Sequence, residues 1–309
     1  MRKLGTTDLD VFGLCLGGNV FGWTADRDAT FAVLDAYAAA GGNFVDTAGS
    51  YGNWVPGNPP GFSETLIGEW MAARGTRDRM VVATKASRDG GLGAAAVREK
   101  AESSLRRLQT DRIDLYYAHF DDPDTPLEET LGAFDALVRE GKVRHIAASN
   151  HAPARLAEAL AISDREGFAR YEALQPLYNL VEREQVEGEL QELCLREGVA
   201  ILPFYALARG FLTGKYRAGS APPDSPRAGA AGAYLETERG RAVLDALDEI
   251  AAAHETTVAA VALAWLLAQP GVAAPIASAR DVEQLEALLP VVELALAPDE
   301  LRRLTDAGA

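Results

Sequence analysis

Eight short apolar runs, separated by longer amphipathic stretches, constrain the fold of this chain more than any other feature. Each run has the length of a buried strand. Strands that alternate with helices pair in parallel through crossover connections, and strands covered on both faces are apolar along their length. The predicted strands span residues 12–18, 43–47, 80–85, 113–119, 144–149, 171–176, 200–205 and 272–276. Eight such units predict an α/β fold of the (β/α)8 TIM barrel class rather than an open doubly wound sheet.

The stretches between the runs repeat at helical spacing. After the third run, Val97, Ala101, Leu105 and Leu108 recur every three or four residues and so share one helical face. The opening sequence RKLGTTDLDVFG has a different pattern, which predicts a β-hairpin with its turn near Gly5. Such a hairpin could close the bottom of the barrel.

The length of the chain fits one barrel. A (β/α)8 barrel commonly reaches 309 residues as a single domain, and we expect one domain over residues 1–309 because no second boundary is visible. One stretch, residues 218–234, is of low complexity and rich in small residues. It is either an idle surface excursion or a lid.

Charge and cysteine content exclude several classes of protein. The net charge is −15, without a clustered basic patch, so we expect no binding to nucleic acid or to an anionic membrane surface. The two cysteines, Cys15 and Cys194, both lie in apolar segments, as in a reduced cytoplasmic protein. The N-terminus is too polar for a signal peptide, and no apolar run is long enough to span a bilayer. Oligomeric state is left open.

Three ionisable side chains lie at the ends of three consecutive predicted strands. They are Asp46 in the second, Lys85 in the third and His119 in the fourth. Active sites of such barrels lie at the C-terminal ends of the strands, and adjacent strands are about 5 Å apart, so we expect the three to converge. Tyr51 would reach them from the small-residue loop after Asp46. A structural ion pair explains any one of these residues alone, but explains three in register less well.

This cluster suits the reduction of a carbonyl group. An adjacent Lys85 ammonium should lower the pKa of the Tyr51 phenol, and Asp46 should hold Lys85 in place. His119 could donate a hydrogen bond to a carbonyl oxygen, while Tyr51 gives that oxygen a proton as general acid. Protein side chains supply no hydride, so a nicotinamide cofactor is required.

The segments DTAGSYG, VVATK and LYYAH match those that carry the Asp, Tyr, Lys and His tetrad of the aldo-keto reductases. The chain resembles that superfamily from LGGNVFGW to PIASARDVEQL, and is similar to its bacterial channel β-subunit-like and deoxysugar-reductase-like branches. The resemblance implies that Asp46, Tyr51, Lys85 and His119 are the catalytic set. It also implies a barrel with an N-terminal hairpin and extra C-terminal helices.

The same resemblance implies how the nicotinamide is held. Ser149 and Asn150 follow the fifth strand and Gln175 ends the sixth, where the family binds the carboxamide. Ser149 and Asn150 could equally cap the helix that follows. The segment PFYALARGFLTGKY resembles the family's strand-seven segment and assigns Phe204 as the residue that stacks on the ring, although Tyr205 stands where serine is usual. The loop after it, including Leu207, Arg209 and Gly210, would contact the pyrophosphate.

Candidates for the adenosine phosphate follow the eighth strand. They are Ser278, Arg280 and Gln284, at the start of a helix where barrels often bind phosphate. Arg280 suits a 2′-phosphate, which favours NADPH over NADH, although NADH remains possible. Ala287 and Leu288 depart from the family's adenine contacts, and a surface arginine without a ligand is the alternative for Arg280.

The sequence says less about the substrate. Trp23 and Trp54 are expected to line its pocket, although Trp54 could instead pack against a lid or a neighbouring chain. No metal is expected, because the four histidines form no ligand motif. These features predict an NADPH-dependent carbonyl reductase that acts on a small aldehyde or ketone. The alternatives are an NAD(P)-dependent dehydrogenase or reductase of a sugar, and a cofactor-sensing subunit without turnover.

Overall fold

The computed structural model describes residues 1–87, 89–219 and 225–309. Its main sheet has eight parallel strands in the order β10-β3-β4-β5-β6-β7-β8-β9. The strands are β3 (Cys15–Gly17), β4 (Phe44–Asp46), β5 (Val81–Ala86), β6 (Ile113–Ala118), β7 (Val143–Ser149), β8 (Tyr171–Gln175), β9 (Ala200–Ile201) and β10 (Ile276–Ala277). The two edges of this sheet meet, because Ile201 forms a parallel bridge with Val272 and the Ile276 amide donates to the Pro203 carbonyl at 2.9 Å. The sheet is therefore the predicted (β/α)8 barrel.

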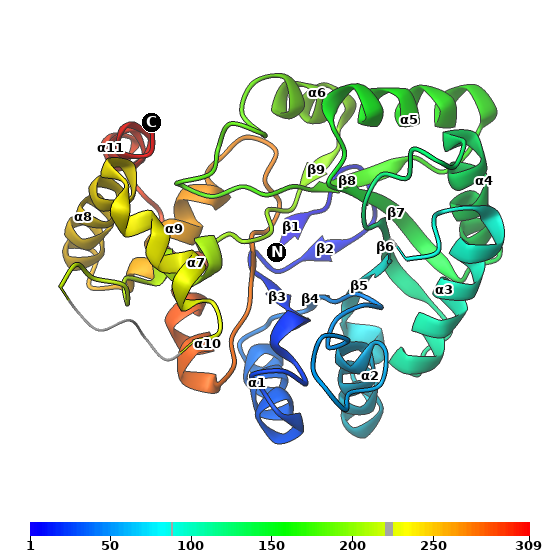
Figure 1. The fold of residues 1–309 in the computed structure, drawn as a ribbon, viewed down its shortest axis with the longest axis horizontal. Coiled ribbons are helices and arrows are strands. Elements are labelled where there is room, and N and C mark those ends of the chain that lie inside the picture. Colours follow the sequence, from blue (N-terminus) through cyan, green and yellow to red (C-terminus); the bar gives the residue numbers. More distant parts are fainter. Residues whose placement is uncertain (88, 220–224) are drawn as a thin grey trace.

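Helices surround the barrel and extend beyond it on one side (Figure 1). Between β3 and β9 each strand is followed by one helix, and these are α1 (Arg27–Ala39), α2 (Phe62–Arg74), α3 (Ala94–Leu108), α4 (Leu127–Arg139), α5 (Pro153–Glu166) and α6 (Glu189–Glu197). The remaining helices are α7 (Ala228–Gly232), α8 (Glu238–Ala253), α9 (Val258–Leu267), α10 (Val282–Leu288) and α11 (Pro298–Ala307). The last of these, α11, packs against α8 outside the ring of helices, as the resemblance implied.

Side chains at the predicted spacing form the core between helices and sheet. On α3, Val97, Ala101 and Leu108 are fully buried and Leu105 is half-buried, so the apolar stripe covers the sheet. Within the part of the chain that the structure describes, no single helix is long and apolar enough to cross a membrane. Only α8 and α9 together, bent by 100° at the break between them, meet those criteria of length and composition.

The N-terminal hairpin closes the bottom of the barrel. Strands β1 (Arg2–Lys3) and β2 (Asp10–Val11) pair antiparallel, and Figure 1 shows them at the centre of the ring. Leu4 and Leu9 are buried in one cluster with side chains that point into the barrel. Gly5 has a φ of +55°, and a Cβ there would lie 2.7 Å from the Glu172 carbonyl oxygen. Only glycine allows the turn to approach the sheet so closely.

Several predicted strands are shorter than expected, and β3 spans Cys15–Gly17 rather than residues 12–18. Strand β9 ends at Ile201 rather than at residue 205, and β10 begins at Ile276 rather than at residue 272. Pro203 and Pro275 lie at these points, and proline has no N–H to donate to a neighbouring strand. The low-complexity stretch 218–234 contains α7, and its residues 220–224 lie outside the described part of the chain.

Candidate active site

Three neighbouring strands bring three of the predicted site residues, an aspartate, a lysine and a histidine, to one rim of the barrel. Asp46 is the last residue of β4, Lys85 lies one residue before the end of β5, and His119 directly follows β6. Lys85 Nζ lies 2.6 Å from Asp46 Oδ2, and both side chains are almost completely buried. The adjacency predicted from the strand ends is therefore present in the fold, although their catalytic roles stay predictions.

Lys85 is surrounded by acceptors for all three of its N–H groups. Besides Asp46, its Nζ donates to the Thr47 carbonyl oxygen at 2.8 Å and to the Tyr51 hydroxyl at 3.3 Å. Burial by itself lowers the pKa of Lys85, but attraction to Asp46 and Tyr51 outweighs it and leaves that pKa above its usual value. Lys85 is therefore an ammonium at neutral pH.

The pKa of Tyr51 differs from the sequence-based expectation. Lys85 does favour the phenolate, but burial of the phenol has the larger effect and raises the pKa of Tyr51 above its usual value. The expected lowering is therefore not found, because the tyrosine is too deeply buried for one ammonium to offset the loss of hydration. Tyr51 is consequently protonated at neutral pH, and its proton lies beside a fixed positive charge.

His119 is neutral in this position. Burial, together with the nearby Lys85 charge, lowers the pKa of His119 to about 3. Its ring stacks on Phe120 at 4.7 Å between centroids, and the Tyr51 ring lies 6.3 Å away. The Asn150 amide donates to the His119 carbonyl oxygen at 3.0 Å and holds the backbone here. A neutral imidazole can donate one hydrogen bond to a ligand that lies between it and Tyr51.

Polar side chains after β7 and at the end of β8 continue the rim. Ser149 Oγ donates to the Gln175 carbonyl oxygen at 2.9 Å, and the Asn150 amide donates to Ser149 Oγ at 3.0 Å. Gln175 Nε2 donates to Asp46 Oδ1 at 2.9 Å, so both carboxylate oxygens of Asp46 are occupied. Helix α5 begins after Ala152 and has no side-chain cap, so Ser149 and Asn150 do not cap it.

One cavity of about 790 Å³ collects nearly all of the predicted residues. Lys85 is the exception, since it lies buried behind Asp46 and Tyr51. The predicted residues that line the cavity are Trp23, Asp46, Tyr51, Trp54, His119, Ser149, Asn150, Gln175, Phe204, Leu207, Arg209, Gly210, Ser278, Arg280 and Gln284. Among the described residues, no group of three or more His, Cys, Asp or Glu side chains could hold a metal ion.

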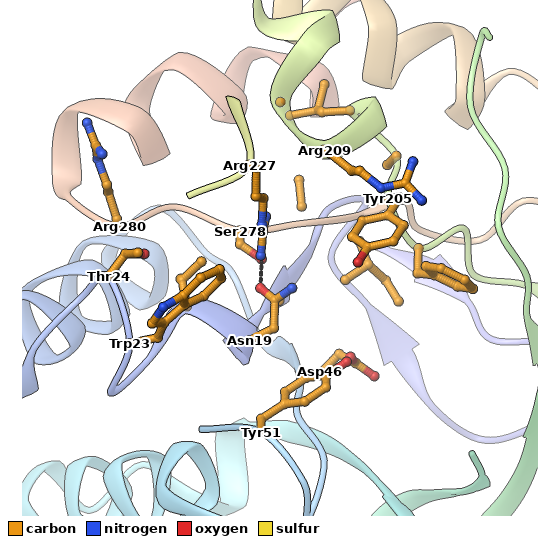
Figure 2. A pocket seen from close by; sticks show the side chains of 18 of the residues that line it. Asn19, Trp23, Thr24, Asp46, Tyr51, Tyr205, Arg209, Arg227, Ser278 and Arg280 are labelled. Atoms are coloured by element: carbon orange, nitrogen blue, oxygen red, sulfur yellow. Dashed lines mark hydrogen bonds between the residues drawn. The ribbon is translucent and has the colours of Figure 1, made fainter. Parts of the chain in front are cut away.

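Several cavity residues were missed by the sequence reasoning. Asn19, two residues after the end of β3, accepts a hydrogen bond from Ser278 Oγ at 2.7 Å in the middle of the cavity (Figure 2). Lys215 and Arg227 also line the cavity, and within the described ranges neither pairs with a carboxylate. Burial lowers the pKa of both, and Arg280 and Arg227 lower that of Lys215 further. In the view of Figure 2, Arg227 and Arg280 lie on the side away from Tyr51.

Of the two cationic residues Lys215 and Arg227, only Lys215 lies next to a segment that the sequence assigned to the cofactor. Lys215 belongs to the segment FLTGKY, which follows the loop already assigned to the cofactor. Arg227 lies in the low-complexity stretch, where nothing local distinguishes it from a surface arginine. Its guanidinium lies 5.3 Å from the centroid of the Trp23 ring, which comes from the opposite end of the sequence.

The segment after β9 is held in an uncommon backbone conformation. Tyr205, Ala208 and Arg209 have φ values of 50°, 46° and 58°, which non-glycine residues rarely adopt. Arg209 stabilises this shape, because its guanidinium lies 4.6 Å from the Tyr205 ring and donates to the Tyr234 hydroxyl at 2.8 Å. Such strain clusters at ligand sites, and here it directs the backbone toward the cavity.

Aromatic rings form the wall beside Tyr51. Trp54 meets Trp23 edge to face at 5.7 Å and lies 6.1 Å from the Tyr51 ring. Trp54 remains 49% exposed, and Phe120 lines the same cavity. Trp54 therefore packs within the mouth of this cavity, against Trp23 and Tyr51.

Comparison with known proteins agrees with the predicted fold and family. The sequence model described as "Aldo/keto reductase family" matches residues 13–309. The "Uncharacterized oxidoreductase YrpG" of Bacillus subtilis (strain 168) is 36% identical, over 98% of this chain and 94% of the relative. The NADP(+) aryl-alcohol dehydrogenase of Phanerodontia chrysosporium is 32% identical, over 92% and 77%. "Protein tas" of Escherichia coli (strain K12) is 31% identical, over 98% and 96%.

The family match and the oxidoreductase names of these relatives define the class of protein, an oxidoreductase that works with a nicotinamide cofactor. The chain belongs to the aldo/keto reductase family. The residues present fit such a cofactor, because one cavity combines Lys215 and Arg227, which have no carboxylate partner among the described residues, with hydroxyl and amide groups beside Tyr51.

Proposed function

We propose that this protein is an NADPH-dependent carbonyl reductase in which Tyr51 protonates the oxygen of an aldehyde or ketone. The observation that carries the proposal is the chain of contacts from Asp46 through Lys85 to the Tyr51 hydroxyl, which ends at the wall of the cavity. The bound cofactor supplies a hydride to the carbonyl carbon, and NADPH is oxidised as the carbonyl is reduced to an alcohol.

The side chains on the rim hold the proton, transfer it to the substrate and stabilise the phenolate that remains. Tyr51 is protonated before reaction and gives its proton to the developing alkoxide. The Lys85 ammonium, held by Asp46, then stabilises the phenolate that remains. Neutral His119 donates a hydrogen bond that orients the substrate oxygen toward Tyr51. Each group is held by its neighbours, so little reorganisation accompanies the transfer.

We propose for the cofactor-binding residues the same roles that the sequence predicts. Ser149, Asn150 and Gln175 would hold the carboxamide, and Phe204 would stack on the ring. Backbone groups of Leu207, Arg209 and Gly210 would contact the pyrophosphate. Ser278, Arg280 and Gln284 would bind the adenosine phosphate. We add Lys215 and Arg227, since unpaired cations in a cavity favour an anionic ligand, and their number supports NADPH over NADH.

An aryl aldehyde or ketone is the substrate that the cavity supports best. Trp23, Trp54 and Phe120 offer flat apolar surfaces beside the proton donor, and aromatic rings pack well on such surfaces. Relatives named aryl-alcohol dehydrogenase and norsolorinic acid reductase B point in the same direction. The buried free thiols of Cys15 and Cys194 are in keeping with the proposed cytoplasmic location.

The experiment that tests this function follows NADPH oxidation at the nicotinamide absorbance with a panel of aldehydes. Wild type and Tyr51→Phe are compared, each with a parallel NADPH-binding titration. Turnover by the wild type that is lost in the variant, at unchanged binding, supports the reductase. Tight binding without turnover on any aryl, alkyl or sugar carbonyl would instead support a cofactor-sensing subunit.

A further inference from the structure

The loop that carries Tyr51 rests on one arginine from a different helix. Residues 47–61 connect β4 to α2, and the Arg107 side chain comes from the last turn of α3. A Cβ placed on Gly49 would lie 3.2 Å from Arg107 Nη2, and one on Gly61 would lie 2.3 Å from Arg107 Nε. The guanidinium therefore packs directly against the backbone at both ends of the loop, two residues before Tyr51 and one residue before α2.

A fully buried carboxylate connects this arginine to the strand of Lys85. Arg107 Nε donates to Glu64 Oε2 at 2.6 Å, and the other oxygen of Glu64 accepts from Thr84 Oγ1 at 2.6 Å. Thr84 directly precedes Lys85 on β5. Glu64 has no exposed surface, and the Arg107 side chain is 23% exposed. Neither residue lines the cavity.

Gly49 lies where these groups meet. Its ideal Cβ would be 3.2 Å from Arg107, 3.8 Å from the Lys85 carbonyl oxygen and 3.9 Å from Glu64 Oε2. The backbone that leads into Tyr51 thus touches the strand of Lys85 and the ion pair at one point. A shift of the Arg107–Glu64 ion pair would change the position of Tyr51 relative to Lys85. The Lys85 Nζ donor and the Tyr51 hydroxyl acceptor are 3.3 Å apart.

We propose that Arg107 and Glu64 are positioning residues that set the distance between the Tyr51 hydroxyl and Lys85 from behind the cavity. The proposal rests on the proposed role of Tyr51 as proton donor. Proton transfer depends steeply on geometry, and a misplacement of about 1 Å costs about 100-fold in rate. The pair touches neither substrate nor cofactor, so its loss should lower kcat and leave cofactor binding nearly unchanged.

A matched pair exists at the opposite end of β5. Arg77 Nη2 lies 2.8 Å from Asp114 Oδ2, and the Asp114 side chain is 1% exposed. Asp114 is the second residue of β6 and accepts from the Val82 amide at the start of β5 at 2.9 Å. This pair is similarly buried and also contacts β5, but at the end of that strand opposite to the rim. It is therefore the control for loss of stability alone.

The test compares the double variant Arg107→Met with Glu64→Gln against the control double variant Arg77→Met with Asp114→Asn. Removing both charges avoids a buried unpaired ion, which would cost stability for unrelated reasons. We expect both double variants to have a lower Tm. Only the first should lose about ten- to 100-fold in kcat, with less than about threefold change in the Kd for NADPH. The single variant Arg107→Lys keeps the positive charge beside Glu64, so its kcat should lie between that of the wild type and that of the Arg107 and Glu64 double variant.

A gentler variant keeps the proposal testable if the double variant does not fold. Gly49→Ala adds one methyl group that meets Arg107, and Gly93→Ala adds one that meets Glu129 Oε1 at a similar 3.1 Å outside the cavity. We expect kcat to fall severalfold for the first and to stay unchanged for the second. Equal kcat in the two alanine variants, or in the two double variants, overturns the proposal.

Hydrogen exchange separates this proposal from the proposed function. Amides of residues 48–61 should exchange faster in the Arg107 and Glu64 double variant and not in the control. Unchanged exchange overturns the positioning role whatever the activity. If Tyr51→Phe is as active as the wild type, the proposed function fails, while faster exchange still supports the pair as the support of this loop.

Discussion

The two ends of this barrel use the same kinds of residue for different purposes. At the bottom, Asp114 is bound by Arg77 and Arg144, and Arg144 also contacts Asp8 on the hairpin. At the rim, Asp46 is bound by Lys85, and Lys215 and Arg227 face a cavity without a carboxylate partner in the described part of the chain. The hairpin covers the bottom, whereas the rim stays open.

The difference teaches what separates a structural charge from a functional one. At the bottom the charges neutralise one another and the backbone is covered, so the network holds the hairpin in place. At the rim, positive charge exceeds negative charge around a cavity of about 790 Å³, and the strained residues Tyr205 and Arg209 border it. An excess of one charge around a cavity favours a ligand of the opposite charge.

The largest effect is expected for Tyr51→Phe at the rim. The substitution removes the proton donor and keeps the ring, so kcat should fall by about 100-fold to 10,000-fold while the Kd for NADPH stays nearly unchanged. Steady-state kinetics with an aryl aldehyde and a fluorescence titration measure the two quantities. Comparable turnover in the variant would refute Tyr51 as general acid. It would also remove the functional difference that we propose between the rim and the bottom of the barrel.

A smaller effect is expected for the unpaired cations. Lys215→Ala and Arg227→Ala should each weaken NADPH binding about tenfold and reduce its dependence on salt, because each removes a charge that faces the phosphates. Arg144→Ala, at the bottom, is the matched control and should leave the Kd unchanged. Equal Kd values for all three proteins would mean that the excess of charge at the rim does not serve the cofactor.

Arg280 allows the binding of two cofactors, NADPH and NADH, to be compared at the rim itself. If it contacts a 2′-phosphate, Arg280→Ala should weaken NADPH binding severalfold and leave NADH binding almost unaffected, since only NADPH carries that phosphate. Titrations with both cofactors, and with Arg302→Ala as a control on α11, measure this difference. Losses of the same size for both cofactors would contradict the contact.

The smallest effect is expected at the bottom, for Asp8→Asn. Hydrogen bonding to His145, with a further contribution from Arg144, lowers the pKa of Asp8 despite some burial. A depressed folded-state pKa stabilises the protein above the ordinary pKa, and this contribution is lost as the pH falls through the folded value. Asp8 is largely exposed, so the variant should lose less than about 1 kcal/mol of unfolding free energy at pH 7.

The pH dependence of that loss is the decisive measurement. Denaturant unfolding at several pH values should give a difference between wild type and Asp8→Asn that begins to shrink at about pH 4, the ordinary pKa of an aspartate, and disappears only below the lowered pKa of Asp8 in the folded protein. The kcat of the variant should equal that of the wild type. A loss of activity would show that the hairpin network, too, reaches the active site.

The sequence indicated the fold and the cluster that we propose as catalytic, because both follow from local patterns. Apolar runs and helical spacing are properties of adjacent residues, and Asp46, Lys85 and His119 each stand at the end of such a run. The strand ends near Pro203 and Pro275 were misjudged, although proline marks such points. Asn19 and Arg227 escaped detection because their neighbours in the cavity come from distant segments.

The sequence by itself therefore determined the alternation of strands and helices, the hairpin and the residues that end the strands. Only the tertiary structure decided which charges stay unpaired, how Arg107 and Glu64 support the loop of Tyr51, and whether the pKa of Tyr51 rises or falls. The physical reason is that periodicity depends on neighbours along the chain. Burial and electrostatic balance depend instead on groups that the fold brings together from far apart.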